Sequence, residues 1–292
     1  TDRNDFEVLI CDEAHRIRRV STNRWTKKHL RSDRPQIDEL MAAARVPVFL
    51  LDEHQVVRPG EMGTVAAIRE HADRLKLTVR QIDLDAQFRC GGSRKYEEWV
   101  LGLLGLDGLR PIPWTGDEHF AVHLADGPEE LEHTLRGKLT EGFGARITAG
   151  YCWPWHEPRA DDSLEPDVRI GTWERPWNAK SENSVGDAPP SALWATADGG
   201  FEQIGCVYTA QGFEYDWNGV IIGPDLVARD GRLITQRWES RDPDLRPKSV
   251  SDHDADRLIR NTYKVLLTRG MMGTYIYSAD KETQEFLTAL LP

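Results

Sequence analysis

The 292-residue chain has 39% hydrophobic and 29% charged residues, a composition that supports a folded core and excludes a disordered chain. Its length fits one very large domain or two ordinary ones. The mean hydropathy is -0.55, and no apolar run approaches the roughly 20 residues needed to cross a bilayer, which excludes a membrane span. The formal net charge of -11 excludes a uniformly basic nucleic-acid-coating protein but leaves room for a local basic groove.

The cysteine pattern indicates a reducing compartment. The four cysteines lie far apart and form no CxxC pair: Cys11, Cys90, Cys152 and Cys206. This spacing argues against a zinc ribbon and against a disulfide scaffold, so we predict a cytoplasmic protein. The chain begins with Thr-Asp-Arg and has neither an initiator Met nor a signal-like apolar stretch. We therefore expect it to be a piece of a longer polypeptide.

Short apolar runs alternate with segments of helical periodicity in the first half of the chain. The predicted strands are 6–11, 46–51, 78–84, 120–124 and 145–151. The predicted helices are 37–44, 61–75, 93–104 and 128–140. The first two strands are mainly apolar and are expected to be buried. This alternation predicts an α/β fold with a parallel sheet that helices cover on both faces.

The alternation stops at about 152–200, which is rich in Pro, Asp, Ser and Trp and is read as a functional insertion. It holds five of the ten Trp residues: Trp153, Trp155, Trp173, Trp177 and Trp194. We expect their rings to pack the insertion onto the sheet, and a surface that stacks unpaired bases is the alternative. Regular patterning resumes at 203–208 and 219–222. After a polar stretch at 229–253, we expect a helix at 254–268, a strand at 274–277 and a last helix from 281.

The segment VLICDEAHRI, residues 8–17, is an apolar strand followed by two acids, Asp12 and Glu13. Ligands of parallel sheets collect at the carboxyl ends of strands. In phosphate chemistry, Asp12 would hold a magnesium ion, directly or through water, and Glu13 would orient or deprotonate the attacking water. An acidic N-cap on a following helix is the alternative.

The segment VFLLDEHQVVRPGE, residues 48–61, repeats this design, with Asp52 at a strand end and Gln55 in the loop that follows. If the two strands are neighbours, both side chains face the same crevice. A Gln at such a point can bond a terminal phosphate and report its loss. An ordinary strand-to-helix loop is the alternative.

Three further segments carry candidate residues. LDAQFRC, residues 84–90, places Arg89 just beyond a strand. Residues 207–225 read as a strand, a Gly turn and a second strand, with the polar face Thr209, Gln211, Glu214 and Asp216. Residues 261–277 read as a helix that ends at Arg269, with a strand behind it. An Arg at the edge of a cleft can neutralise charge on a transferring phosphoryl group, although a lone Arg is more often a surface ion-pair partner.

Taken in this order, the five blocks resemble motifs II to VI of the superfamily 1 helicases. DEAH is similar to motif II, DEHQ to motif III, QFR to motif IV, TAQGFEYD to motif V and YKVLLTRG to motif VI. The set that includes LDEHQVVRPGE and CWPW most closely resembles the Schlafen-type branch of bacterial helicase-like proteins. The resemblance implies two RecA-like parallel-sheet lobes of the P-loop NTPase type that clamp ATP and Mg²⁺. It also implies helicase or translocase activity on DNA or RNA, with single strands as the expected track.

The resemblance also assigns roles to individual residues. Asp12 and Glu13 would be the magnesium and water residues, and Gln55 the γ-phosphate sensor. Arg89 and Arg269 would be the arginines supplied by the second lobe. Asp52 and Glu214 would lie by the nucleotide. Gln211 and Gly212 would couple its site to the nucleic acid. Tyr208 and Thr209 would contact the nucleic-acid backbone. Asp52 follows Leu51, where many relatives have Gly.

The phosphate-cradling loop GxxxxGK[ST] does not occur in the sequence. Gly-Lys occurs at Gly137-Lys138, followed by Leu139, within a predicted helix. We therefore expect the loop in a preceding segment of the same polypeptide, so that the first lobe, residues 1–78, is truncated. Residues 79–292 would form the second lobe with its Trp-rich insertion. The fragment alone is expected to be inactive.

Two other functions remain open from the sequence. A nucleotide-responsive regulatory or scaffold module would keep the fold and lack strand separation. A metal-dependent nuclease would use scattered acids of the second half: Glu165, Asp167, Asp187 and Asp198. Unwinding assays would discriminate the first function from a helicase, and metal-dependent cleavage without ATP would indicate the second.

Overall fold

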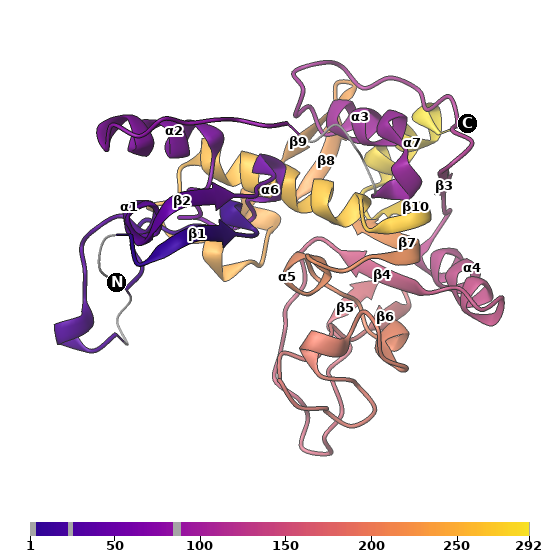
Figure 1. The fold of residues 1–292 in the computed structure, drawn as a ribbon. Helices are drawn as coiled ribbons and strands as arrows, with labels where there is room; N and C mark the ends of the chain where they lie inside the picture. Colours follow the sequence, from indigo (N-terminus) through magenta and orange to yellow (C-terminus); the bar gives the residue numbers. More distant parts are fainter. Residues whose placement is uncertain (1–3, 23–25, 84–88, 292) are drawn as a thin grey trace. The chain divides into compact units, whose positions relative to one another are not determined.

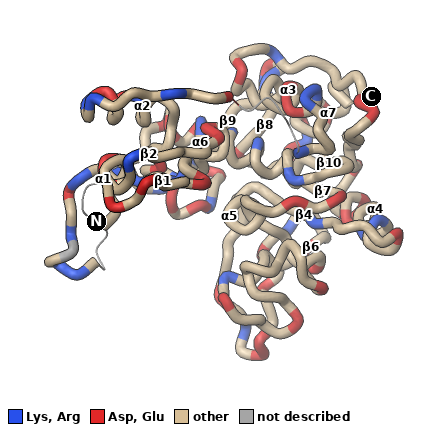
Figure 2. Tube along the Cα trace, viewed as in Figure 1, with Lys and Arg blue, Asp and Glu red and all other residues tan. Residues whose placement is uncertain are grey.

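The computed structural model describes residues 4–22, 26–83 and 89–291 (Figure 1). The chain divides into two compact units, residues 1–84 and 85–292, and each is described by itself. Acidic and basic residues are interspersed along the trace of both units (Figure 2). No helix in the described ranges is both long and apolar enough to cross a membrane.

The first unit is built on two parallel strands, β1 (Phe6–Cys11) and β2 (Ala44–Phe49). The helices are α1 (Gln36–Ala43) and α2 (Val65–Arg74), with short 3-10 turns η1 (Ala14–Arg16), η2 (Lys28–Leu30) and η3 (Glu53–Gln55). A small core joins the turn after β1 to both helices and contains Ala14, Ile17, Ile37, Met41, Ile68 and Ala72. The strand predicted at 6–11 is therefore present with the predicted bounds, and the strand at 46–51 and the helices at 37–44 and 61–75 are present with shifted ends.

The expectation that the first two strands are buried is wrong. Phe6, Val8 and Ile10 are 50%, 55% and 65% exposed, and Val46 on the neighbouring strand is 54% exposed. Alternate residues of a strand point to the same face, so these side chains share one face of the two-stranded sheet. Helix α1 contacts both strands, and the described part of the unit leaves the apolar face in solvent.

The predicted strand at 78–84 is also not found in its described part. Residues 78–83 form neither helix nor strand, and Leu84 to Phe88 lie outside the described residues. The side chains at 78–83 are exposed. An isolated extended segment has no neighbour to accept its backbone hydrogen bonds, so apolar residues alone do not make it a strand.

The second unit contains a four-stranded parallel sheet with the order β3-β10-β7-β4. Its strands are β3 (Ala121–Leu124), β4 (Ala145–Ala149), β7 (Tyr215–Ile222) and β10 (Gly270–Ser278). In this register Thr274 lies opposite both Val122 and Asn218. The predicted strands at 120–124, 145–151 and 274–277 are confirmed, and the last is longer than predicted.

Helices cover both faces of this sheet (Figure 1). They are α3 (Arg94–Leu103), α4 (Pro128–Thr140), α6 (Asp252–Leu267) and α7 (Lys281–Leu290). A Cβ on Gly219 would lie 2.5 Å from Leu135 of α4, whereas Nδ2 of the adjacent Asn218 donates to the backbone oxygen of Leu266 in α6. Because neighbouring strand residues point to opposite faces, α4 and α6 lie on opposite faces. The α/β class and the covered parallel sheet of a RecA-like lobe are thus confirmed.

The Trp-rich insertion packs onto the face of the sheet that α4 covers. It contains a small antiparallel hairpin of β5 (Val168–Ile170) and β6 (Trp173–Arg175). The fully buried indoles belong to Trp173, Trp177 and Trp194, while Trp153 and Trp155 pack partly buried against the same core. Where the chain returns, Gly205 pairs with β4, exchanging backbone hydrogen bonds with Ala149 and Ile147. The packing role predicted for these rings is confirmed.

Residues 207–225 do not form the predicted strand, turn and strand. The first part is the single-turn helix α5 (Val207–Ala210), in which the Ala210 N–H donates to the Cys206 carbonyl. Gly212 then turns the chain with φ of 94°, and β7 follows. A four-residue run is too short for periodicity to distinguish a helical turn from a strand.

A hairpin in the second unit was not predicted. Strands β8 (Leu226–Arg229) and β9 (Arg232–Thr235) pair antiparallel. Asp230 and Gly231 connect them with φ of 52° and 71°. An Asp-Gly pair with both φ values positive is the turn that tight hairpins favour. This dipeptide was the available sequence signal.

Candidate functional site

The first group of candidate residues lies where β1 and β2 end. The Leu50 N–H donates to the Cys11 carbonyl, and the Ala14 N–H donates to the Leu50 carbonyl. These bonds hold the ends of the two strands together. Asp12 and Glu13 follow one strand and Asp52 follows the other, so the first unit places them at one sheet edge, as the sequence predicted.

Asp12 and Glu13 differ in surroundings. Asp12 is exposed, and its Oδ1 accepts a 2.9 Å hydrogen bond from the Glu13 N–H. Glu13 has φ of 52°, a left-handed conformation that is uncommon for residues other than Gly. Its Oε2 is buried and accepts no hydrogen bond from any described residue. An oxygen with unused acceptor capacity at this place can bind a water molecule.

His15 is a neighbour of Glu13 that the sequence reasoning did not single out. Its Nε2 lies 3.2 Å from Glu13 Oε2, and its side chain is 1% exposed. Burial lowers the pKa of His15, although the carboxylates of Glu13, Glu61 and Asp52 act in the opposite direction. The imidazole is therefore neutral at neutral pH. Its position in the DEAH string was the signal that could have identified it.

The loop after β2 is fixed by its own acids. Asp52 caps η3, with Oδ1 accepting from the His54 N–H at 3.0 Å and Oδ2 from Gln55 Nε2 at 3.1 Å. Glu61 Oε2 accepts from the N–H groups of Val57 and Arg58 at 3.0 and 3.1 Å. Gln55 is 3% exposed. The structure thus brings Asp52 and Gln55 into direct contact, and it gives Asp52 a structural task beside the predicted nucleotide role.

The second group lies in the second unit, around Arg269. This residue joins α6 to β10 and is 1% exposed. Its Nε donates to the Val265 carbonyl at 2.9 Å and its Nη1 to the Phe213 carbonyl at 3.4 Å. Its Nη2 is buried and has no partner among the described residues. The second unit therefore encloses the whole side chain and fixes the orientation of its guanidinium.

Arg89 and Glu214 complete this group. Arg89 Nε lies 3.3 Å from Glu214 Oε1, with side chains 29% and 40% exposed. Burial lowers the pKa of Arg269, and the positive charge of Arg89 lowers it further. Two guanidinium groups therefore share one nearby carboxylate. They lie at the amino ends of β7 and β10, because Glu214 precedes β7 and Arg269 precedes β10.

A close approach of two backbones fixes Arg89 near β10. Cys90, Gly91 and Gly92 follow it with φ of 53°, 62° and 82°. A Cβ on Gly91 would lie 2.8 Å from the backbone oxygens of both His119 and Met271. Only Gly fits both this space and this conformation.

The remaining predicted residues of the second unit lie in and after α5. Gln211 is 8% exposed. Position 212 favours Gly because its φ of 94° is one that other residues rarely adopt. Crowding is not the reason, since no atom lies within 4 Å of the position that a Cβ would take. The Tyr208 hydroxyl donates to Asp242 Oδ2 at 2.5 Å, and the Thr209 hydroxyl donates to Asn178 Oδ1 at 3.0 Å. Both hydroxyls thus hold parts of the unit together, and their predicted nucleic-acid contacts stay predictions.

Comparison with known families matches residues 1–280 to the family described as Schlafen group 3, DNA/RNA helicase domain. The chain belongs to this family. It is also 23% identical, over 96% of its length, to the uncharacterized protein YPL245W of Saccharomyces cerevisiae (strain ATCC 204508 / S288c). The match covers 64% of that protein, so the Schlafen group 3 domain spans less than two thirds of this relative's length.

The donor set of this Schlafen domain suits a hard cation at Asp12. Magnesium binds through one or two carboxylates together with phosphate oxygens and waters, and Asp12 offers an exposed carboxylate. Among the described residues, no group of three His, Cys, Asp or Glu side chains could hold a metal ion alone. Two of the acids considered for a nuclease have other partners: Glu165 pairs with Arg159 at 2.6 Å and Asp167 with His156 at 2.6 Å.

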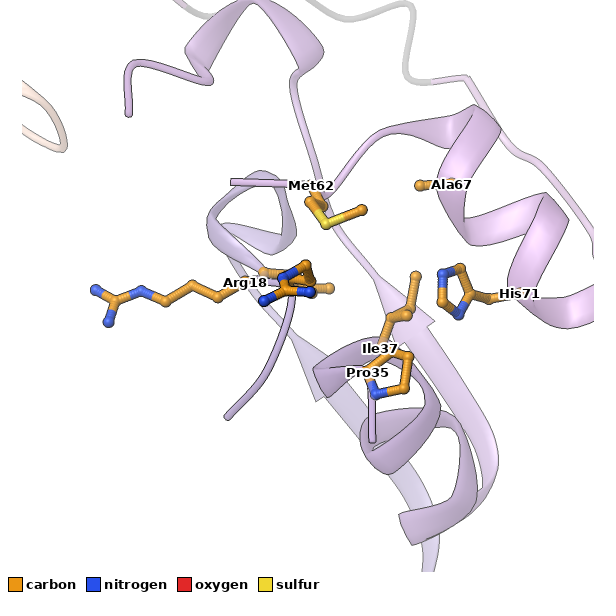
Figure 3. A pocket seen from close by; sticks show the side chains of 8 residues that line it. Arg18, Pro35, Ile37, Met62, Ala67 and His71 are labelled. Carbon is orange, nitrogen blue, oxygen red and sulfur yellow. The ribbon is translucent and has the colours of Figure 1, made fainter. Parts of the chain in front are cut away.

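A small pocket of the first unit is lined by none of the candidate residues (Figure 3). Its volume is about 60 Å³, which is far below the 300–1,000 Å³ typical of ligand sites. Ile37, Met62 and Ala67 are among its mainly apolar lining. His71 at its wall is held by Asp38, with 2.7 Å between His71 Nδ1 and Asp38 Oδ1. This pocket is a packing defect between α1 and α2 and not a candidate nucleotide site.

Proposed function

We propose that this Schlafen domain is the part of an ATP-dependent helicase or translocase that couples ATP hydrolysis to movement on single-stranded DNA or RNA. The observation that carries the proposal is the grouping of Arg89, Arg269 and Glu214 in the second unit. Two guanidinium groups beside one carboxylate leave an excess of positive charge, as a phosphate site requires. Membership of a DNA/RNA helicase family supports the same assignment.

The buried Arg269 suits a role in the transition state. Its guanidinium is oriented in advance by the carbonyls of Val265 and Phe213, and its buried Nη2 has no partner among the described residues, so that a phosphate oxygen would reach it only after the covering residues move. A preoriented donor with little exposure to water stabilises developing charge more strongly than a mobile surface side chain. Arg89 would exchange part of its contact with Glu214 for a phosphate oxygen.

The first unit would supply the metal and water residues. Asp12 would hold Mg²⁺, which when bound neutralises charge on the phosphate oxygens. Glu13 would accept a proton from the attacking water through Oε2, an oxygen that lies 3.2 Å from His15 Nε2 and 3.6 Å from Arg16 Nε. His15 and Arg16 beside it would keep Glu13 in place. Gln55, fixed by Asp52, would report the terminal phosphate.

The proposal needs a phosphate-binding loop from another segment of the protein. No GxxxxGK[ST] occurs in the 292 residues, and Gly137-Lys138 lies inside α4, where Lys138 Nζ pairs with Glu141 at 3.0 Å. Backbone N–H groups and the Lys of such a loop provide most contacts to the triphosphate.

Glu13→Gln in the longer protein that carries this domain tests the proposal. We expect ATP binding to persist and nucleic-acid-stimulated hydrolysis to fall to background, because an amide cannot accept the proton. A fluorescent-nucleotide titration and a phosphate-release assay measure the two quantities. Glu53→Gln in the neighbouring strand-end loop is a matched control. Normal hydrolysis by the Glu13 variant would make Glu13 a structural residue and remove the proposed base. Strand-separation assays then distinguish a helicase from a nucleotide-responsive module that does not unwind.

A further inference from the structure

Trp238 is the large apolar side chain with the highest exposed fraction in the described part of the chain. It lies in the short 3-10 turn η7 (Arg237–Glu239), and 73% of its surface is exposed. The tryptophans of the insertion, in contrast, are buried or half-buried against the core. A single exposed apolar side chain is common on protein surfaces, but an exposed indole offers a large flat face that a partner can cover.

The backbone that carries Trp238 is held firmly. The adjacent Arg237 donates from Nε and Nη2 to the Leu245 carbonyl at 3.0 and 2.6 Å. Its Nη1 donates to the Val250 carbonyl at 2.8 Å and to Asp252 Oδ1 at 2.9 Å. One guanidinium thus closes the loop 237–250 from inside. The ring of Trp238 is presented from a fixed turn and not from a loose loop.

The same loop is attached to the segment for which nucleic-acid contacts were predicted. The Arg241 N–H donates to the Tyr151 carbonyl at 2.7 Å. The Asp242 carboxylate accepts from the Tyr208 hydroxyl at 2.5 Å, and Tyr208 belongs to α5. Loop 237–250 and α5 therefore lie side by side on the surface of the second unit.

Three cationic side chains of the loop are exposed: Arg241, Arg246 and Lys248. Within the described ranges none of their side chains makes an ion pair or hydrogen bond. The loop also carries three acids: Asp242 is buried and accepts from the Tyr208 hydroxyl, Glu239 is half-buried and Asp244 is exposed. On the exposed surface of the loop the three cations outnumber the one exposed acid, Asp244, and they share this loop with an exposed indole, on a chain with net charge -11.

We propose that Trp238, with Arg241, Arg246 and Lys248, is a contact surface for single-stranded nucleic acid. A base would stack on the indole while the three cations contact neighbouring phosphates, a combination that tolerates any base sequence. The inference rests on the proposed function and adds the residues that bind the track. None of the four belongs to the helicase-like motifs, and all come from the polar stretch 229–253.

The first test is the affinity of the protein for a fluorescein-labelled oligo-dT and an oligo-U of about 20 nucleotides, followed by fluorescence anisotropy. Trp238→Ala should weaken binding about 10-fold or more, the loss expected for one base-stacking contact. Trp238→Phe should retain most of the affinity because the ring persists. Leu109→Ala is the matched control, because Leu109 is an exposed apolar residue of the same unit, 69% exposed. Circular dichroism confirms that each variant is folded.

The second test concerns the cations. The double variant Arg241→Gln and Arg246→Gln should lower the slope of log affinity against log salt by about 1.4, since each phosphate contact on a single strand contributes about 0.7. Arg110→Gln, an exposed cation elsewhere in the unit, should leave the slope unchanged.

The outcomes separate this inference from the function on which it rests. If the protein binds both oligonucleotides and Trp238→Ala binds them equally well, the surface is overturned while the helicase proposal stands. If the unaltered protein binds neither oligonucleotide, the helicase proposal fails and the inference fails with it. If Trp238→Ala keeps its oligonucleotide affinity and loses only binding to a protein, the loop is a protein-docking surface and the inference is overturned.

Discussion

Arg89 Nε lies 3.3 Å from Glu214 Oε1, although 125 residues separate the two in the sequence. The two side chains are 29% and 40% exposed, and ion pairs with this exposure contribute at most about 1 kcal/mol to stability. The buried Arg269 is close enough for the charge of Arg89 to lower its pKa. The ion pair thus lies beside a buried cation and adds little to the free energy of unfolding. This is what we expect if the two side chains serve to bind a ligand.

Arg89→Gln and Glu214→Gln should each change the free energy of unfolding by less than about 1 kcal/mol, because the pair is solvent-screened. If the proposed function holds, Arg89→Gln should also lower the rate of ATP hydrolysis by at least about tenfold in a protein that combines this domain with a phosphate-binding loop, since the proposed neutralising arginine would be lost. Urea unfolding and steady-state hydrolysis measure the two effects. A large loss of stability with unchanged hydrolysis would mark the pair as structural.

Arg269→Lys should lower kcat on the order of 10³-fold and change the ATP Kd much less, because a guanidinium that acts in the transition state is lost. Lys keeps the charge but cannot make two parallel contacts. Arg269→Ala is a poorer variant, since it leaves the Val265 and Phe213 carbonyls without their donor. Stopped-flow hydrolysis with a parallel nucleotide titration separates the effects. An unchanged kcat in a folded Lys variant would remove Arg269 from the proposed site.

The 292-residue chain alone should hydrolyse no ATP above background and should bind ATP weakly, because its sequence contains no GxxxxGK[ST]. Phosphate release and isothermal titration calorimetry check the two statements. Robust turnover by the chain alone would show that another loop binds the triphosphate.

Gly205→Ala should destabilise the second unit by about 1–3 kcal/mol, the usual cost of overpacking a core. The new Cβ would lie 2.2 Å from a ring atom of Trp194, a fully buried indole that cannot bend away. Gly137→Ala is the matched control, because no atom lies within 4 Å of its Cβ position and Ala favours the helix α4 by up to about 1 kcal/mol. Thermal unfolding should show shifts in opposite directions, and equal shifts would contradict the packing described.

Asp280→Asn should lower the free energy of unfolding by about 1 kcal/mol at pH 7, after allowance for solvent screening. Hydrogen bonds from Arg229 lower the pKa of Asp280 to about 2. A depressed carboxyl pKa stabilises the fold above the unfolded pKa, so the advantage should shrink from about pH 4 towards pH 2. Urea unfolding at several pH values measures it. Glu282→Gln, which removes a more exposed partner of Arg229, should have a smaller effect, and a pH-independent Asn effect would contradict the assignment.

The sequence predicted an element correctly where the residues of that element alone determine its structure. Pro128–Thr140 is helical over the predicted bounds, because a Pro at the first position, acids in the first turn and an apolar stripe agree. The hairpin β8–β9 was missed despite its Asp-Gly turn, since its apolar runs, residues 226–228 and 233–234, are very short and the second lies in a stretch that is polar as a whole. Residues 78–83 were predicted to form a strand, but they have no neighbouring strand with which to form backbone hydrogen bonds.

The candidate site depended on information that composition and periodicity do not hold. The resemblance of ordered motifs put Arg89, Glu214 and Arg269 into one group, and the structure shows them close together. Spacing alone could not do so, because the contact between Arg89 and Glu214 requires the register of β7 and β10. His15 was overlooked because its burial and its closeness to Glu13 follow from the left-handed turn at Glu13.

The pairing of Gly205 with β4 also covers part of a sheet edge at which other molecules of the protein could pair. A sheet edge with unpaired N–H and C=O groups is a template for strands of other molecules. Gly205 occupies part of that edge, and the insertion is the segment that delivers it there. Shortening the insertion so that Gly205 no longer reaches β4 would open this edge, and we expect the shortened domain to self-associate through it.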